Sequence, residues 1–286
     1  MDGLNGSRME STRTTPAGEA QFDLSLLTDV GNDRPGNEDS CGHFIEDAGN
    51  AIFVVADGVG GYEGGEVASA MAVEITLAGY RENPVAWGAG KRLHRAVQRA
   101  NIEIHNRALA VPELRRMATT LTAAAISNGA LHAAHVGDCR MYLIRNARIR
   151  QLTRDHTVLG ERVRMGLMTA ERARNHPERS ALNRCLGHEL IVSIDLITMP
   201  LSQGDRVIIC SDGLHTVLRD EEFEHMTRDL DAESSCRKLI NAANERGTAD
   251  NLTVAVFLMT GETPNFTEKR PWRERLFGRF SRSNSG

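Results

Sequence analysis

The sequence lacks a cysteine framework, a long apolar run and a strong net charge, and each absence excludes a class of protein. Its five cysteines show no CxxC spacing, which argues for reduced thiols in the cytoplasm rather than for a disulfide-stabilised secreted protein. No apolar run approaches the roughly 18 residues that a membrane span needs. A formal net charge of -4 gives no indication of nucleic-acid binding. We therefore expect a cytoplasmic protein with no stable membrane insertion and no nucleic-acid partner.

What is present is the composition of an ordinary globular protein. Hydrophobic residues make up 41% and charged residues 25% of the 286 residues, enough for one large domain or two small ones. Residues 1–21 are rich in Ser, Thr, Gly and Arg without an apolar signal segment, and they predict a disordered leader. Residues 261–286 form a basic tail with six lysines and arginines against three glutamates. This tail is predicted either to cap the domain as a helix or to dock weakly to a membrane surface or a partner.

Apolar runs and turn signals divide the central region, residues 22–260, into strands and helices. Strands are predicted at 22–30, 51–56, 119–128, 130–135, 141–144, 191–199, 206–210 and 252–259. Helices are predicted at 66–80, 91–109 and 231–246, with a polar helical insertion and a loop at 158–188. Strands and helices do not alternate, which disfavours a doubly wound parallel sheet and favours an antiparallel sandwich with helices packed outside it.

Three aspartates lie at the ends of predicted strands, each beside a turn. Asp57 and Asp212 follow apolar runs, and Asp250 precedes one. Taken singly, an aspartate at such a place more often forms a turn than binds a ligand. Together with the further carboxylates Glu38 and Asp39 they predict a shared cation site, because like charges gather only where cations neutralise them.

The predicted site is a metal centre with oxygen ligands only, a set that selects Mg²⁺ or Mn²⁺ rather than zinc. Two ions about 3.5–4 Å apart can share a bridging carboxylate and activate water against phosphate. Glu38 and Asp39 are expected to hold metal-bound waters from outside the ligand shell. The predicted ligands are Asp57, which is best placed to bridge, the carbonyl of Gly58, Asp212 and Asp250.

Arg34 lies in a turn-rich segment just before Glu38 and Asp39. A guanidinium at this place can bind phosphate oxygens in a bidentate manner. The alternative is an arginine that belongs only to a surface turn. In the first interpretation Arg34 holds the phosphate while the metal centre supplies the nucleophile.

Five motifs occur in an order that resembles the PPM/PP2C family of metal-dependent serine/threonine protein phosphatases, in its bacterial form. They are Arg34-Pro35-Gly36-Asn37-Glu38-Asp39, Asp57-Gly58-Val59-Gly60-Gly61, Gly137-Asp138-Cys139-Arg140, Ser211-Asp212-Gly213-Leu214 and Asp250-Asn251-Leu252-Thr253. The resemblance covers roughly residues 22–260. It implies an α+β fold of four layers, αββα, in which a central antiparallel β-sandwich is flanked by helix pairs.

The resemblance also implies an activity, partners and site residues. The implied reaction is hydrolysis of phosphoserine and phosphothreonine in proteins by a metal-activated water, without a phosphoenzyme. The implied partners are phosphorylated proteins modified by a cognate serine/threonine kinase, and residues 158–188 match a mobile flap beside the active site. The matched site residues are the metal ligands Asp57, Gly58, Asp212 and Asp250, the phosphate-binding Arg34, and Asp138, which matches a ligand of a third, weaker ion.

Val59 and Tyr62 depart from the family pattern, in which bacterial relatives usually carry methionine and histidine. Eukaryotic members have a histidine, proposed as the general acid, at the place of Val59. The proton donor is therefore unassigned, and the spare candidates His43 and His156 are each more typical of structural histidines. The departures leave open a non-enzymatic phosphopeptide-binding module, although no predicted ligand is missing. A metal-dependent phosphodiesterase or nuclease would require a basic body, but the region before the tail carries 28 lysines and arginines against 35 acidic residues.

Overall fold

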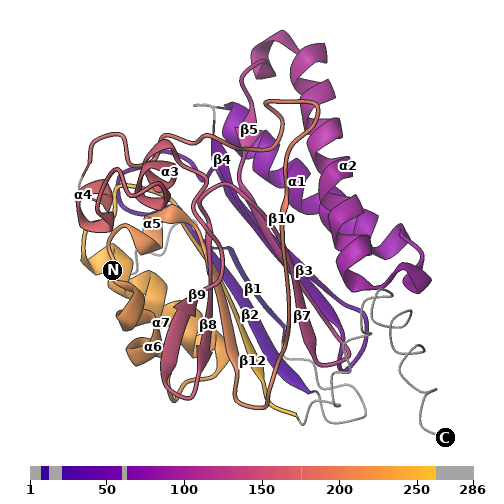
Figure 1. Ribbon diagram of the computed structural model, residues 1–286, viewed down its shortest axis with the longest axis vertical. Coiled ribbons are helices and arrows are strands. Elements are labelled where there is room, and N and C mark those ends of the chain that lie inside the picture. Colours follow the sequence, from indigo (N-terminus) through magenta and orange to yellow (C-terminus); the bar gives the residue numbers. More distant parts are fainter. Residues whose placement is uncertain (1–7, 13–20, 60–62, 175, 262–286) are drawn as a thin grey trace, which may run out of the picture.

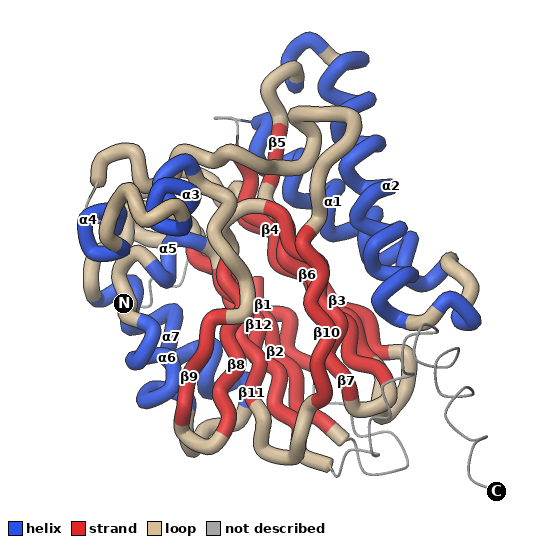
Figure 2. Tube along the Cα trace, viewed as in Figure 1, coloured by secondary structure: helices blue, strands red, loops and turns tan. Residues whose placement is uncertain are grey.

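The computed structural model describes residues 8–12, 21–59, 63–174 and 176–261 (Figure 1). The predicted basic tail, Tyr62 and the remainder of the predicted leader lie outside the described residues. Two antiparallel sheets pack face to face, and helices cover both outer faces (Figures 1 and 2). The predicted four-layer sandwich is therefore confirmed.

The two sheets have different strand orders. The first runs β1 (Arg8–Thr12), β2 (Phe22–Asp29), β12 (Leu252–Met259), β11 (Arg206–Cys210), β8 (Arg140–Arg145) and β9 (Arg148–Gln151). The second runs β10 (Asp195–Pro200), β7 (Ala130–Val136), β6 (Leu121–Ser127), β4 (Ala51–Val59) and β3 (Asp39–Ile45), with β5 (Ala118–Thr119) paired to β4. Strands from opposite ends of the chain, such as β2 and β12, are thus direct neighbours.

Helices lie in three groups around the sandwich (Figure 1). The second sheet is covered by α1 (Glu63–Glu82) and α2 (Ala89–Ala110), with the short 3₁₀ turns η1 (Val85–Trp87) and η2 (Pro112–Leu114) beside them. The first sheet is covered by α5 (Asp212–His215), α6 (Asp220–Thr227) and α7 (Ala232–Glu245). Two short helices, α3 (Val158–Arg164) and α4 (Ala170–Arg174), lie over one end of the sandwich and belong to the predicted flap.

The apolar core forms three layers, one between the sheets and one under each helix group. Between the sheets, the ring of Phe53 stacks on that of Phe257 at 5.8 Å between centroids. Under α6, the ring of Tyr142 stacks on that of Phe223 at 5.0 Å. Because both faces of the central strands are covered, these strands read as continuous apolar runs without alternation, as Ile52–Ala56 does.

Most predicted elements are present, and the differences have local causes. The predicted turn at Asn128-Gly129 is found, with positive φ at both residues, as a tight hairpin requires. The predicted strand at 119–128 is divided at Thr120, whose backbone N–H donates to the carbonyl of Asp57. Strand β3 was not predicted, because its residues are mostly polar or small and it pairs with one strand only.

Two regions gain detail that the sequence did not supply. Within the predicted disordered leader, Arg8–Thr12 forms β1, which pairs antiparallel with the free edge of β2. The isolated bridge from Thr119 to Leu186 attaches the flap to β5, and the bridge from Thr157 to Leu182 closes the flap on itself. Because β5 pairs with the end of β4, the first bridge fixes the C-terminal end of the flap near the predicted site residues.

Candidate active site

The predicted acids meet where strands of both sheets end. Asp57, near the end of β4, lies directly opposite Asp39 at the start of β3. Asp212 follows β11 and is the first residue of α5, and Asp250 lies two residues before β12. Because β11 and β12 are antiparallel neighbours, the end of one lies beside the start of the other. Sheet topology thus brings together acids that are nearly 200 positions apart in the sequence.

The acids form a cluster in which Asp39 and Asp138 are buried and Asp57, Asp212 and Asp250 are half-buried. Burial first, and then the charges of Asp39, Asp212, Asp138 and Asp250, raise the pKa of Asp57 well above its usual range. Burial also raises the pKa of Asp39 to about 7, although hydrogen bonds with Ser211 and Thr253 oppose the rise, and the charges of Asp212 and Asp250 add to it. The pKa of Asp212 rises to about 6, mainly through burial and the charge of Asp250. The predicted ligands are therefore close enough to perturb one another.

The donor chemistry of the cluster fits hard divalent cations. Its side chains offer only oxygen, and Oδ2 of Asp39 is buried without a hydrogen-bond partner among the described residues. Such an orphaned carboxylate oxygen is costly unless a cation satisfies it. Within the same part of the chain, however, no three His, Cys, Asp or Glu side chains are close enough to form a ready-made metal site. The ligand roles of individual residues stay predictions.

Backbone hydrogen bonds fix the position of Asp57. Its N–H donates to Oγ1 of Thr120 at 3.0 Å, and its carbonyl accepts from the N–H of Thr120 and from Oγ1 of Thr119. Gly58 then allows a close approach, because a Cβ there would lie 2.2 Å from the carbonyl oxygen of Gly65 and 2.6 Å from that of Glu38. Any larger residue at position 58 would push the end of β4 away from its neighbours.

The segments that carry Asp212 and Asp250 are packed backbone to backbone. A Cβ on Gly213 would lie 2.1 Å from the carbonyl oxygen of Asn251. Next to it, Ser211 N–H donates to the carbonyl of Thr253, and Thr253 N–H donates to Oγ of Ser211, both at 2.9 Å. The spacing of the two acids is therefore set by the sheet and by one glycine.

Asn251 has a positioning role that sequence reasoning missed. Its Nδ2 donates to the carbonyls of Val30 and Gly36, at 2.8 and 3.0 Å, and its Oδ1 accepts from the N–H of Glu38 at 2.9 Å. One buried amide thus holds both ends of the turn that contains Arg34. The sequence gives no signal for this role, because a single asparagine next to an aspartate is typical of any turn.

Arg34 lies beside the cluster and is paired within it. Its Nη2 donates to Oδ2 of Asp250 at 2.9 Å, and its Nε donates to the carbonyl of Ala249 at 3.3 Å. Nearly half of its side chain remains exposed. The structure therefore places the guanidinium at the mouth of the site, and the ion pair with a predicted metal ligand was not anticipated.

Glu38 interacts with Arg34 and Asp250, whereas Asp138 interacts with Asp212. Glu38 packs against the first turn of α1, since a Cβ on Gly65 would lie 2.8 Å from its carboxyl carbon. Partial burial is the largest cause that raises the pKa of Glu38. Asp138 is buried, and its pKa is raised well above the usual range by burial and by the charge of Asp212. Its backbone carbonyl is 3.0 Å from Nε2 of His215.

The flap borders a large cavity beside the acids. The cavity has a volume of about 1260 Å³, and its walls include Asp138, Asp212 and the flap helices α3 and α4. From the flap, Oγ of Ser180 is 3.5 Å from Oδ2 of Asp212, and the charge of Arg179 lowers the pKa of that acid against the effect of burial. The flap thus reaches the candidate site directly.

The two spare histidines lie in different places: His156 lines the cavity beside Asp138 and Asp212, and His43 lies further along β3. His156 is buried, and its Nδ1 accepts from the N–H of Gly137 at 3.0 Å. Its Nε2 lies 3.0 Å from Nη1 of Arg184 and 3.3 Å from Oδ2 of Asp195. His43 lies four residues along β3 from Asp39, further from the strand end. These positions favour structural roles for both rings.

Comparison with known proteins agrees with this geometry. A family model for protein phosphatase 2C matches residues 32–256. The serine/threonine phosphatase stp of Listeria monocytogenes is 37% identical over 231 residues, which cover 79% of this chain and 92% of the relative. The crystal structure of the Mycobacterium tuberculosis serine/threonine phosphatase PstP/Ppp superposes with a TM-score of 0.76 at 34% identity, covering 84% of this chain and 99% of that chain.

A further solved structure bears on the metal site. It is the catalytic domain of the serine/threonine protein phosphatase PstP in complex with two manganese ions, with a TM-score of 0.74 and 32% identity. The match covers 84% of this chain and 98% of that chain. Fold, cluster and matches agree on one class, the metal-dependent protein phosphatases. The chain belongs to the protein phosphatase 2C family.

Proposed function

We propose that the buried acids hold two divalent cations, Mn²⁺ or Mg²⁺, and that Arg34 binds the substrate phosphate beside them. The chain is a metal-dependent protein serine/threonine phosphatase, which hydrolyses phosphoserine and phosphothreonine in proteins. The observation that carries the metal proposal is the cluster of mutually repelling carboxylates, some buried and some half-buried, with an oxygen on Asp39 that has no hydrogen-bond partner among the described residues. When bound, such ions supply Lewis-acid activation of water and of phosphate oxygens.

The acids would have different roles in binding the ions. Asp57 is the central acid of the cluster, because the charges of four other aspartates raise its pKa. It is therefore the best candidate to bridge the two ions. Asp212, Asp250 and the carbonyl of Gly58 would complete the set, and Asp138 would serve a third, weaker ion. Glu38 and Asp39 would orient water around the ions. In the free protein the raised pKa values mean that part of the cluster is protonated near neutral pH, so these groups must lose protons when cations bind.

Arg34 would release the carboxylate of Asp250 and bind the substrate phosphate instead. In the free protein it neutralises Asp250, and a cation at Asp250 would take over that role. The guanidinium then becomes available to grip two phosphate oxygens. Its exposure and its fixed turn, held by Asn251, suit a group that meets an incoming substrate.

The proposed substrates are phosphoproteins of a cognate serine/threonine kinase. The cavity under the flap is large enough to admit a peptide segment next to Asp212. A phosphopeptide-binding module without turnover and a phosphodiesterase have no particular observation in their favour.

The decisive experiment is hydrolysis of a phosphothreonine peptide by the purified protein with Mn²⁺, with EDTA, and in the variant Asp212→Asn. We expect turnover only with the metal and only in the wild type. Asp229→Asn, at an exposed position, is the matched control and should retain full activity. Activity that persists in EDTA and in Asp212→Asn would exclude the proposed site. Binding of the peptide without turnover would indicate a phosphopeptide-binding module. Faster hydrolysis of a phosphodiester than of the phosphopeptide would indicate a phosphodiesterase.

A further inference from the structure

The open side of the sandwich carries arginines that the proposed function does not use. β9 is the edge strand of one sheet and β10 is the edge strand of the other, and each pairs with only one described strand. Both strands lie toward the reader in Figure 1. Arg148 and Arg150 on β9, and Arg154 just beyond its end, are all exposed. We refer to these three residues as the arginine row.

The strand register directs Arg148 and Arg150 toward the gap between the sheets. Arg150 lies opposite Leu143 and Arg148 lies opposite Arg145, so all four side chains share one face of the hairpin. Leu143 packs in the core between the sheets, which identifies that face as the inner one. At the edge of the core, Nη2 of Arg150 reaches to 4.0 Å from Sδ of Met199 on β10.

The row differs from the arginines around it in its ion pairing. Its neighbours are already neutralised in the pairs Arg140–Asp155, Arg145–Asp205 and Arg184–Asp195. No ion pair involves any member of the row within the part of the chain that the structure describes. Three unneutralised positive charges therefore lie along one edge and attract anions.

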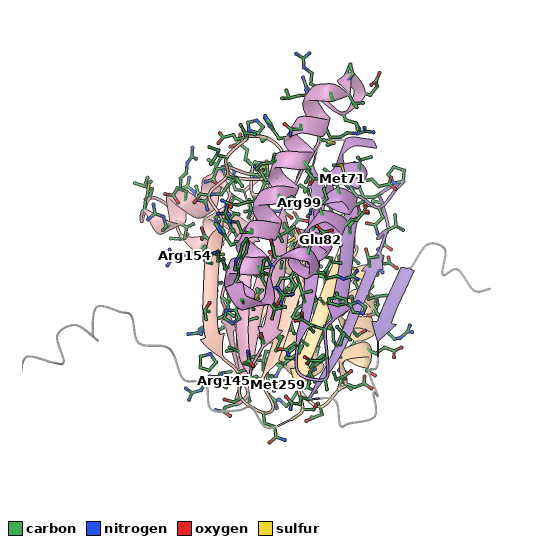
Figure 3. All side chains as sticks on the ribbon, turned by 90° about the vertical axis from the view of Figure 1, so that its right-hand side faces the viewer. Met71, Glu82, Arg99, Arg145, Arg154 and Met259 are labelled. Carbon is green, nitrogen blue, oxygen red and sulfur yellow. The ribbon has the colours of Figure 1, made fainter. Side chains whose placement is uncertain are left out.

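The row leads to the candidate active site. Arg148 and Arg150 line a cavity of about 560 Å³. Arg154 lines the larger cavity, whose wall also contains Asp212. Figure 3 shows Arg154 above Arg145 on the same edge of the molecule, the edge that faces the reader in Figure 1. An extended polymer that binds beside Asp212 can therefore continue along the arginine row.

We propose that the arginine row binds an acidic segment of the phosphoprotein substrate, several residues away from the phosphorylated residue. This inference rests on the proposed function and adds a substrate preference to it. Same-face residues of a strand are spaced by about 6.6–6.8 Å, a spacing that alternate acidic residues of an extended peptide also have. The free edge of β10 lies next to the row and offers backbone groups to such a peptide.

An acidic peptide suits this surface better than a nucleic acid does. The row ends at a cavity whose wall contains Asp138 and Asp212, neither of which forms an ion pair with another described residue. A continuous phosphate backbone would meet these carboxylates, whereas a peptide can place its acidic residues only where the arginines are. The chain also carries a net negative charge.

The test compares three phosphothreonine peptides with one common core. One has no extension, one has alternating aspartates on its N-terminal side, and one has them on its C-terminal side. In the wild type we expect one acidic extension to lower KM about five- to tenfold, the sum of two or three exposed ion pairs. The double variant Arg148→Glu/Arg150→Glu should lose this advantage and keep its kcat/KM for the unextended peptide.

A matched variant separates local binding from general attraction. Arg95→Glu/Arg107→Glu makes the same change of net charge at exposed positions on α2, on the outer face of the other sheet. It should keep the lower KM for the acidic peptide. An extended peptide with lysines in place of aspartates should gain affinity only in Arg148→Glu/Arg150→Glu.

Three results would overturn the proposal. The first is an unchanged advantage of the acidic peptide in Arg148→Glu/Arg150→Glu, and the second is an equal loss in the control variant. The third is tighter binding of an oligonucleotide of equal charge, which would assign the row to nucleic acid. If the wild type does not hydrolyse even the unextended peptide, the proposed function fails instead. Fluorescence anisotropy with an unphosphorylated acidic peptide then tests the row by itself.

Discussion

Buried acids occur in two contrasting settings in this molecule. Asp155 receives two short hydrogen bonds from the guanidinium of Arg140, at 2.7 and 3.0 Å. Burial on its own would raise the pKa of Asp155, but the hydrogen bonds and the charge of Arg140 outweigh it and lower the pKa. In the cluster around Asp57 burial acts in the same direction, and neighbouring acids add to it. The same residue type is thus satisfied in one place and left unsatisfied in the other.

The contrast indicates what the cluster is for. A buried carboxylate that faces other carboxylates is costly unless something neutralises it. The fold can supply such a charge, since Arg140 pairs with Asp155 although the two residues are 15 positions apart in the sequence. At the cluster, within the described residues, Arg34 forms an ion pair with one acid and remains partly exposed, and Arg179 acts on Asp212 through its charge. We infer that the missing positive charge comes from outside the chain.

The largest effect is expected when the centre of the cluster is neutralised. Asp57→Asn keeps the shape of the side chain but removes the charge that divalent cations require. We expect kcat for a phosphothreonine peptide to fall at least about a thousandfold, or about 4 kcal/mol of transition-state stabilisation. Stability in EDTA should be equal to or above that of the wild type, because a repulsive charge is removed. Turnover within tenfold of the wild type would contradict the account.

A large loss of stability is expected when the satisfied acid is made unsatisfied. Arg140→Met leaves Asp155 buried without its partner, which should cost about 3 kcal/mol of unfolding free energy. Urea unfolding measures this loss. The double variant Arg140→Met/Asp155→Asn should recover much of it, and no recovery would mean that the arginine acts mainly through other contacts.

A pH-dependent effect of intermediate size is expected from Asp39. Its pKa of about 7 in the folded state is above the unfolded value, so folding takes up a proton between about pH 4 and pH 7. The stability that this group contributes is full below pH 4 and is lost as the pH rises through 7. In EDTA, we expect Asp39→Asn to gain on the order of 2 kcal/mol relative to the wild type between pH 5 and pH 8. A difference independent of pH would contradict the raised pKa.

The smallest effect is expected at the one arginine that touches the cluster. Arg34→Ala should raise KM for the phosphopeptide about tenfold, because it removes a bidentate contact to phosphate worth about 1.4 kcal/mol. Arg34→Lys should restore only part of the loss, since an ammonium cannot make the bidentate contact. Steady-state kinetics at saturating Mn²⁺ measure both variants. An unchanged KM in Arg34→Ala would mean that Arg34 does not bind the phosphate and only pairs with Asp250.

The sequence allowed the fold and the acids to be predicted for a clear physical reason. Strand ends next to glycine turns are visible as a local pattern, so Asp57, Asp212 and Asp250 could be found without coordinates. The four-layer arrangement followed from a resemblance, and the structure agrees with it. That these acids perturb one another is a property of pairing between β11 and β12 and between β3 and β4, and no local pattern reveals it.

Other features were missed because their signals are weak or absent in the sequence. The role of Asn251 depends on three backbone partners that lie more than 200 residues away. Strand β9 is short and polar, so Arg148 and Arg150 had no recognisable element to lie on. The pairing of Arg34 with Asp250 depends on a turn whose shape only the folded chain defines.

The measurement that tests the central claim most directly is calorimetric titration of the metal-free protein with Mn²⁺ in buffers of different ionisation enthalpy. The account predicts that the cluster binds two ions and releases protons, more at pH 6.5 than at pH 8.5, because Asp39 and Asp212 are partly protonated in the free protein. It also predicts that Asp57→Asn loses this binding. Unchanged Mn²⁺ binding in Asp57→Asn, or binding without proton release at pH 6.5, would contradict the claim that these acids form a binding site for divalent cations.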